Sequence, residues 1–160
     1  MCGIVDRNMR HQLTKPIDHA GGQFYDWLMR RRGKIVVGGS NFREEFYGKI
    51  EGDYRWLQEL KRANAIVEIC DKDVDRVESS LRNNGHVKSD DWHVLALAIV
   101  GKARLLFTND TNLQEDFKND KLIYGPRGKV YSTREKQGQY DPKTHGGLLK
   151  NRRLCTAYSR

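Results

Sequence analysis

Short apolar runs alternate with segments of helical periodicity along most of this chain, and that alternation limits the possible folds more than any other feature. The apolar runs are Cys2 to Val5, Ile35 to Val37, Ala65 to Cys70 and Leu105 to Phe107. Runs this short, separated by amphipathic segments, are typical of buried strands joined by crossover helices. We therefore predict an α/β fold of three layers, α/β/α, around a mostly parallel sheet of four or five strands. Lys121 to Tyr124 is the candidate fifth strand.

The intervening segments predict helices with defined starts. In the first, Phe24, Trp27 and Leu28 share one face, and Ser40 or Asn41 is the expected N-cap of the second. Asp71 is the expected N-cap of a later helix that ends near Gly85. The expected helices cover Ile17 to Arg32, Tyr54 to Ala63, Asp71 to Gly85, Trp92 to Val100 and Asn112 to Lys118, and another that begins at Ser40 or Asn41 turns Phe42 and Phe46 inward.

The alternation stops at Gly125, where Gly, Pro, Lys, Gln and Ser become dominant. The sequence thus predicts one domain over residues 1–124 and a basic, loop-rich C-terminal extension over residues 125–160. Residues 121–160 contain ten Lys or Arg but only Glu135 and Asp141 as acids, so the net charge of +8 lies entirely there. A basic segment beside a neutral domain indicates a polyanionic partner, although a solubilising tail is the simpler alternative. The run Arg30 to Arg32 at a helix end is explained by the helix dipole, with a phosphate contact as the alternative.

Cysteine usage and hydropathy indicate the compartment. The cysteines are Cys2, Cys70 and Cys155, an odd number without CxxC spacing, which argues against a disulfide framework or a zinc site. Cys70 ends an apolar run and is expected to be a buried thiol. The longest apolar stretch, Val94 to Val100, is too short to cross a bilayer, and charges interrupt the N-terminus. We expect a cytoplasmic protein without membrane contact.

Acidic residues follow the predicted strands or open the predicted helices. They are Asp6, Glu44, Glu45, Asp90, Asp91 and Asp110. In open α/β sheets, ligands bind in the crevice beyond the carboxyl ends of the strands. Clustered carboxylates repel one another unless a cation neutralises them, and hard oxygen ligands suit Mg²⁺ or Mn²⁺. Each acid alone has a structural explanation as a helix cap or a solvated side chain, but their shared position favours a site for one or two ions.

Two motifs carry a resemblance to a known family. The segment Asp91-Trp-His-Val-Leu-Ala-Leu-Ala98, followed by Gly101-Lys-Ala-Arg-Leu-Leu-Phe-Thr-Asn-Asp110, resembles the second half of PIN-domain nucleases. The N-terminal Gly3-Ile-Val-Asp6 with Asn8 resembles the first motif of that family. The resemblance covers roughly residues 2 to 124, and it is specific in the second half only.

The resemblance implies metal-binding and catalytic roles for Asp6, Glu45, Asp91 and Asp110. Glu45 is preferred to Glu44 because Phe46 follows it, although one helical step would reverse that choice. Supporting positions are Asn8, Asn112, Glu44 and Asp90. His93, on the apolar helix that begins at Asp91, is expected to be a packed or hydrogen-bonded residue and not a metal ligand.

The implied activity is hydrolysis of phosphodiester bonds in single-stranded nucleic acid, RNA more than DNA, leaving 3′-hydroxyl and 5′-phosphate ends. The resemblance also implies a bacterial toxin or defence effector, a homodimer and a cognate inhibitor protein. Four cations of the extension, Lys129, Lys150, Arg152 and Arg153, are expected to bind phosphates, and Tyr131 and Tyr140 to stack on bases.

Two alternatives remain open at this stage. One is a non-catalytic RNA-binding module that uses the basic extension. The other follows from the opening Met1-Cys2-Gly3-Ile4, which resembles glutamine amidotransferases with an N-terminal cysteine nucleophile. The second alternative leaves the acidic residues unexplained.

Overall fold

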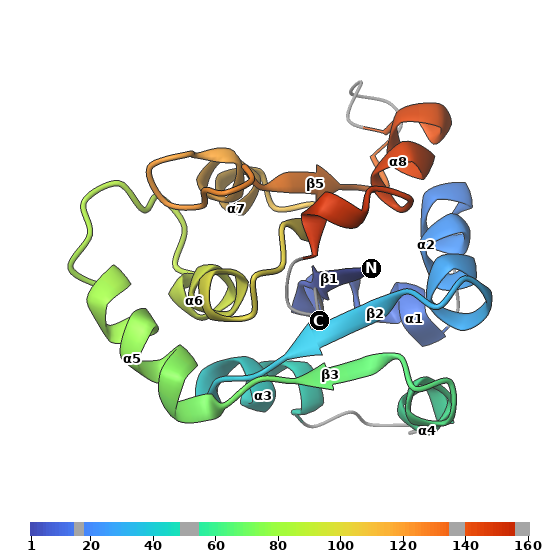
Figure 1. The fold of residues 1–160 in the computed structure, drawn as a ribbon, viewed down its shortest axis with the longest axis horizontal. Coiled ribbons are helices and arrows are strands. Elements are labelled where there is room, and N and C mark those ends of the chain that lie inside the picture. Colours follow the sequence, from blue (N-terminus) through green and yellow to red (C-terminus); the bar gives the residue numbers. More distant parts are fainter. Residues whose placement is uncertain (15–17, 49–54, 135–139, 156–160) are drawn as a thin grey trace.

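A five-stranded sheet, parallel throughout, forms the centre of the molecule (Figure 1). The computed structural model describes residues 1–14, 18–48, 55–134 and 140–155. The strand order is β3-β2-β1-β4-β5. The strands are β1 (Cys2–Val5), β2 (Lys34–Val37), β3 (Ile66–Glu68), β4 (Leu105–Phe107) and β5 (Lys129–Tyr131). The predicted α/β class with a parallel sheet is confirmed.

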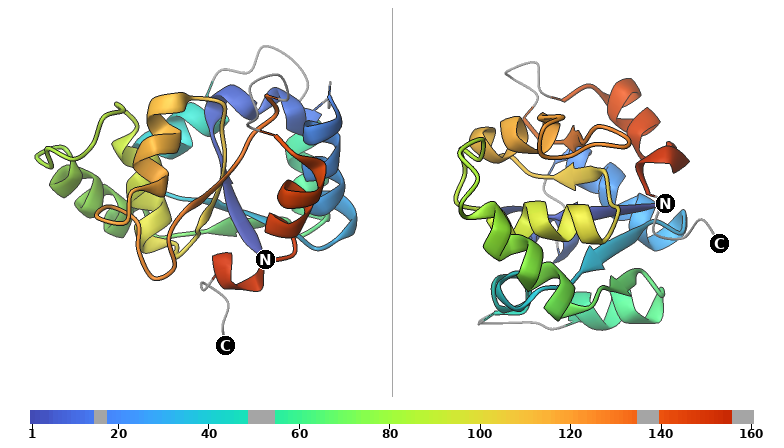
Figure 2. Two further views of the ribbon diagram at one scale, coloured as in Figure 1. Left: turned by 90° about the horizontal axis from the view of Figure 1, so that it is seen from above. Right: turned by 60° about the vertical axis from the view of Figure 1, so that its left-hand side comes forward.

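Helices connect the strands in a way compatible with three α/β/α layers (Figure 2). Within the described residues they are α1 (His11–Thr14), α2 (His19–Arg30), α3 (Ser40–Tyr47), α4 (Arg55–Arg62), α5 (Asp71–Leu81), α6 (Trp92–Val100), α7 (Thr111–Lys118) and α8 (Pro142–Leu148), with 3₁₀ turns η1 (Arg7–Met9) and η2 (Arg152–Leu154). Six consecutive residues of α6, from His93 to Ala98, are buried, which explains why this helix is apolar on every side. None of the helices in the described parts of the chain has the length and apolarity that crossing a bilayer requires.

The fifth strand differs from its predicted position. Residues 121–124 form turns, and β5 begins at Lys129, where its backbone pairs with Leu105 of β4. Leu122 and Ile123 are buried all the same, because their side chains pack into the core from a turn. The prediction that the apolar run at residues 121–124 is the fifth strand is therefore wrong, because that run pairs with no strand in the described structure.

Residues after 125, expected to be a loop-rich extension, contain β5, α8 and η2, and β5 pairs with the sheet. Strand β5 closes one edge of the sheet, and its Tyr131 is fully buried with its hydroxyl donating to the Ala20 carbonyl. Tyr140 is 6% exposed, and its hydroxyl donates to Gln23. Neither tyrosine is therefore available to stack on a base. His145 of α8 packs edge-on against both rings.

A disulfide joins Cys2 of β1 to Cys155 after η2, contrary to the prediction that no disulfide forms. The two cysteines are 153 residues apart in sequence. They meet because the C-terminal segment pairs with the residue before β4: the Arg104 amide donates to the Leu154 carbonyl. Cys2 is 2% exposed and bonded, so it is unsuited to be the nucleophile of an amidotransferase. Cys70, predicted to be buried, is an exposed free thiol.

Candidate active site

Two acids lie where adjacent strands end. Asp6 follows β1 and Asp110 follows β4, and these strands are parallel neighbours, so both acids lie at one edge of the sheet, called here the carboxyl edge. Thr108 links them: its hydroxyl donates to Asp6 Oδ2 at 2.7 Å and accepts the Asp110 amide at 3.0 Å. The predicted strand-end pairing of these two acids is therefore present in the fold.

Asp91 and Glu45 reach the same edge from α6 and α3. Burial, followed by the negative charges of Asp6, Asp110 and Glu45, raises the pKa of Asp91 to about 6, while His93 opposes the shift. Charges act on one carboxyl group in this way only when they are close to it in a poorly solvated space. The structure thus brings together Asp6, Glu45, Asp91 and Asp110 from four separate segments.

Asp6 is the most enclosed of the four. Burial raises the pKa of its carboxyl group, and Asp110 adds to that effect, whereas hydrogen bonds from Thr108 and from the Asn8 backbone lower it. Asn8, predicted to support the site, therefore acts through its main-chain N–H, while its side chain is exposed. Asn8 is in the 3₁₀ turn η1, which begins at the residue after Asp6, and this turn places the Asn8 N–H next to the Asp6 carboxyl group.

Glu45 is paired with His93, the histidine expected to be a packed or hydrogen-bonded residue of α6. Glu45 Oε2 lies 2.9 Å from His93 Nε2, and His93 is buried against the Phe42 ring. The sequence places His93 only two residues after Asp91 at the start of one helix, so its position near the site could have been expected. Glu44 and Asp90 are exposed, and the exposed side chain of Asn112 forms no hydrogen bond to any residue that the structure describes.

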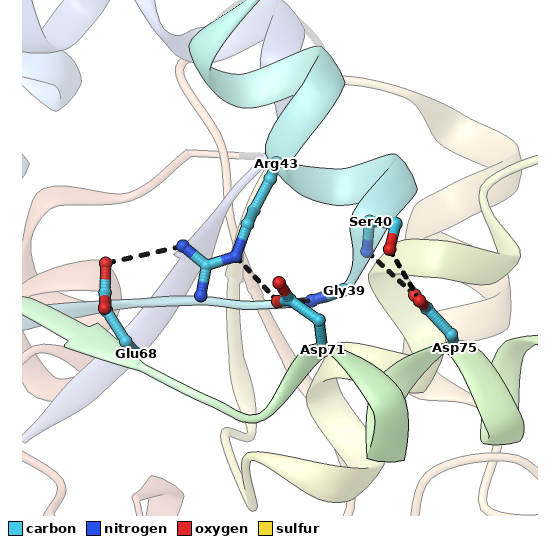
Figure 3. Close-up of polar contacts among 6 residues, drawn as sticks. All are labelled: Gly39, Ser40, Arg43, Glu68, Asp71 and Asp75. Atoms are coloured by element: carbon cyan, nitrogen blue, oxygen red, sulfur yellow. Dashed lines mark hydrogen bonds and ion pairs between the residues drawn. The ribbon is translucent and has the colours of Figure 1, made fainter.

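The helix that carries Glu45 is anchored at its N-terminus by acids from α5 and not by its own side chains (Figure 3). Gly39, at φ 87°, is the N-cap of α3. Asp71 accepts the Gly39 amide at 2.8 Å and the Arg43 guanidinium at 2.6 Å, and Asp75 accepts both the amide and the hydroxyl of Ser40. The prediction that Ser40 or Asn41 is the N-cap of α3 is therefore wrong. The prediction that Asp71 is the N-cap of α5 is also wrong, because Cys70 has that position. Helix α5 instead fixes the start of α3.

A buried carboxylate fixes the loop that leads to Asp91, and sequence reasoning missed it. Asp116 of α7 is 1% exposed and accepts the backbone amides of Lys88 and Ser89 at 2.7 to 3.1 Å. Three charge-assisted bonds hold this loop two residues before Asp91. An acid inside an amphipathic helix gives no local sequence signal for such a role, because its partners lie 27 and 28 residues away.

A groove of about 680 Å³ has Glu45, one of the four carboxylates, in its lining. Three arginines, Arg7, Arg10 and Arg82, line the same groove together with Glu44, Asp90 and His93. The three arginines come from η1, the residue after it and the residue after α5. This groove, defined here as the arginine groove, therefore places cations next to the acidic site.

The three guanidinium groups differ in their attachment. Arg10 donates to the Phe46 carbonyl at 2.7 Å, at the end of α3. Arg82 is ion-paired with Glu78 at 2.8 Å and stacks over the Trp92 ring. Arg7 is exposed and makes no ion pair with any residue that the structure describes. Arg7 is therefore the cation most available to an incoming anion.

The four cations predicted to bind phosphates lie elsewhere. Lys129 is the first residue of β5, and Arg152 is close enough to the α-amino group of Met1 to lower its pKa, together with burial and Lys34. Lys150 also lies beside Met1, and Arg153 belongs to η2. They all lie where the strands begin, called here the amino edge, about 13 Å from the carboxyl edge at ~3.3 Å per residue. The sequence could not reveal this separation, since it depends on the path of the C-terminal segment.

The donor set at the carboxyl edge consists of carboxylate oxygens, which suit a hard divalent cation. In the described residues, no three acidic, cysteine or histidine side chains are arranged as a ready coordination group. One oxygen of Asp110 caps α7 by accepting the Leu113 amide at 2.9 Å, and one oxygen of Glu45 pairs with His93. Among the residues that the structure describes, no hydrogen bond or ion pair engages the other oxygen of either carboxylate.

Comparisons with known proteins add nothing to the geometry. No protein-family model matches the chain, and the searches of curated proteins and of solved structures gave no significant match.

Proposed function

We propose that this protein is a metal-dependent endonuclease for single-stranded nucleic acid, with RNA as the preferred substrate. The observation that carries the proposal is the effect of three other carboxylates on Asp91: burial first, and then the charges of Asp6, Asp110 and Glu45, raise its pKa to about 6. A protein tolerates such mutual repulsion at functional sites more often than elsewhere. The hydrogen bond from Thr108 to Asp6 joins the Thr108-Asn109-Asp110 turn to the end of β1, the two segments to which the resemblance to PIN-domain nucleases assigns metal-site acids.

Asp6, Glu45, Asp91 and Asp110 would hold Mg²⁺ or Mn²⁺ through their carboxylate oxygens at the carboxyl edge. A bound ion supplies an activated water and neutralises charge on the phosphate. Thr108 keeps Asp6 and Asp110 in register, and His93 orients Glu45. Water would form a new bond to phosphorus while the bond from phosphorus to the 3′-oxygen breaks and that oxygen takes up a proton, so the products would carry 3′-hydroxyl and 5′-phosphate ends.

The arginine groove supports a polyanionic substrate at this same edge. Cations beside an acidic site allow a phosphate chain to approach carboxylates that would otherwise repel it. The groove opens at the surface and is lined by side chains that offer many hydrogen-bond donors, which suits an extended strand. A cytoplasmic toxin role, a homodimer and a cognate inhibitor protein belong to the same proposal.

The proposal is tested by incubating the protein with labelled single-stranded RNA and DNA in Mn²⁺. We expect cleavage of RNA, its loss with EDTA, and products with 5′-phosphate ends. In the Asp110→Asn variant, cleavage should fall on the order of 10³-fold, because a ligand charge is lost while the cap of α7 can still accept the Leu113 amide.

Three results would count against the nuclease. They are 2′,3′-cyclic phosphate ends, cleavage that persists in EDTA, or full activity of Asp110→Asn. If RNA binds with strong salt dependence and neither protein cuts it, the non-catalytic RNA-binding module becomes the better description.

The position of the substrate is tested by comparing one arginine from each edge. We expect Arg7→Gln to weaken binding of single-stranded RNA and to reduce the slope of log K against log salt by about 0.7, the value for one lost phosphate contact. Arg153→Gln, also exposed but at the amino edge, is the matched control and should leave the slope unchanged. Filter binding at several salt concentrations measures both, and the reverse pattern would assign the substrate to the C-terminal segment.

The raised pKa of Asp91 predicts a pH dependence for metal binding. Only the ionised carboxylate binds a cation, so affinity should fall as the pH decreases through about 6. Between pH 7 and pH 5 we expect the Kd for Mn²⁺ to rise by about tenfold, the effect of one proton over one pH unit below its pKa. Calorimetric titration at both pH values measures this, and an unchanged Kd would mean that Asp91 is not a ligand.

A further inference from the structure

A second cavity lies at the amino edge, far from the acids. Its volume is about 370 Å³, and it opens between the C-terminal part of α2 and helix α8. Met1, Trp27, Pro142 and Leu149 form apolar walls. A space of this size is at the lower end of the range for small-molecule sites. The nuclease proposal makes no use of it.

Cations surround this cavity. Arg31, Lys143 and Lys150 line it, and none of the acidic side chains that the structure describes does so. Arg31 is paired with Asp26, whereas no ion pair is formed by Lys143 or Lys150 within the described residues. The pKa of the Met1 α-amino group is lowered by burial and by Lys34 and Arg152, as expected where positive charges accumulate. Asp26 offsets Arg31, and Asp141 lies close enough to Lys143 to interact with it, but the cations beside the cavity still outnumber these two acids, which favours an anion.

The residues that line the cavity favour a ligand whose remaining part is apolar. Gln23 is the lining residue with a neutral amide, and its oxygen already accepts from Tyr131 and Tyr140. A nucleobase would leave its polar edge unpaired against such walls, at a cost in free energy, whereas an aryl or alkyl body would not. The buried Trp27 indole N–H has no acceptor among the described residues, so an oxygen reaching that wall would satisfy it.

We propose that this cavity binds a small phosphate monoester with an apolar aryl or alkyl body. The body occupies the space between α2 and α8, and the phosphate lies at the mouth near Lys143 and Lys150. The proposal is independent of the nuclease proposal, because the two sites are at opposite edges of the sheet.

The test uses phenyl phosphate and two-dimensional NMR of the full chain in metal-free buffer. We expect chemical-shift changes at the Gly146 and Gly147 amides and the Trp27 indole N–H, and none at Asp6 or Asp110. Changing both Lys143 and Lys150 to Gln should weaken binding at least tenfold, about 1.4 kcal/mol. Inorganic phosphate and benzyl alcohol, which each lack one half of the ligand, should bind more weakly than phenyl phosphate.

Gly147 offers a variant that blocks the cavity without disturbing the fold. It lines the cavity, and a Cβ at this position meets no atom within 4 Å. Gly147→Leu should therefore abolish the shifts, while Gly22→Leu, an equally open helical glycine in α2 outside the cavity, should preserve them. The proposal fails if phenyl phosphate causes no localised shifts at millimolar concentration, if inorganic phosphate binds as well, or if adenosine monophosphate binds more tightly.

Discussion

The Asp91→Asn protein should be inactive as a nuclease and yet more stable than the wild type. With a folded-state pKa of about 6 against 3.8 for the free side chain, the folded protein holds the Asp91 proton more tightly than the unfolded chain does. Stability from this group is therefore greatest at low pH and is lost as the pH rises through about 6. At pH 7 the ionised side chain opposes folding, and its replacement by a neutral amide removes that opposition.

We expect a gain of about 1 kcal/mol, well below the full shift, because Asp91 is only partly buried and solvent screens its neighbours. Asp91 is the N-cap residue of α6 but makes no side-chain capping bond, so the amide sacrifices none. Cleavage should fall on the order of 10³-fold through loss of a ligand. Urea unfolding at pH 7 and the Mn²⁺ cleavage assay measure the two effects.

Asp90→Asn is the control, since Asp90 is the adjacent residue, exposed and on the rim of the arginine groove. It should change stability by less than about 0.5 kcal/mol and retain cleavage. A destabilised Asp91→Asn protein would show that the four carboxylates do not repel one another. Stable, fully active Asp91→Asn would remove Asp91 from the site.

Loss of the Cys2–Cys155 disulfide should have the largest effect on stability. The bond closes a loop of 153 residues, so it restricts the unfolded chain almost from end to end. We expect Cys155→Ser to lower the free energy of unfolding by about 3 kcal/mol, the middle of the usual range for native disulfides. Guanidinium unfolding of oxidised protein gives the value.

Reduction by a thiol provides the internal comparison. It should lower the stability of the wild type to that of Cys155→Ser and leave the variant unchanged, and Cys70→Ser, at the exposed free thiol, should match the wild type throughout. Equal stability of oxidised and reduced wild type would mean that the bond contributes nothing. Since cytoplasmic thiols are kept reduced, the result also bears on the predicted compartment.

Local sequence determined the elements whose stability depends on near neighbours. Strands β1, β2 and β4 and helices α2, α5 and α6 lie within a few residues of their predicted positions, because burial of one face repeats with the period of the element. The same argument placed Asp6 and Asp110 at strand ends, and parallel strands bring such ends to one edge.

Only the tertiary structure decided the features whose partners are distant in sequence. Strand β5 is defined by its pairing with β4, and Cys2 meets Cys155 because the C-terminal segment returns to the amino edge. The same path of the C-terminal segment places Lys150 at the amino edge, away from the acids. Arg7, which follows Asp6 in the chain, lies in the arginine groove beside the acids. Composition records how many charges a chain has, whereas the edge at which each charge lies depends on long-range packing that no local pattern encodes.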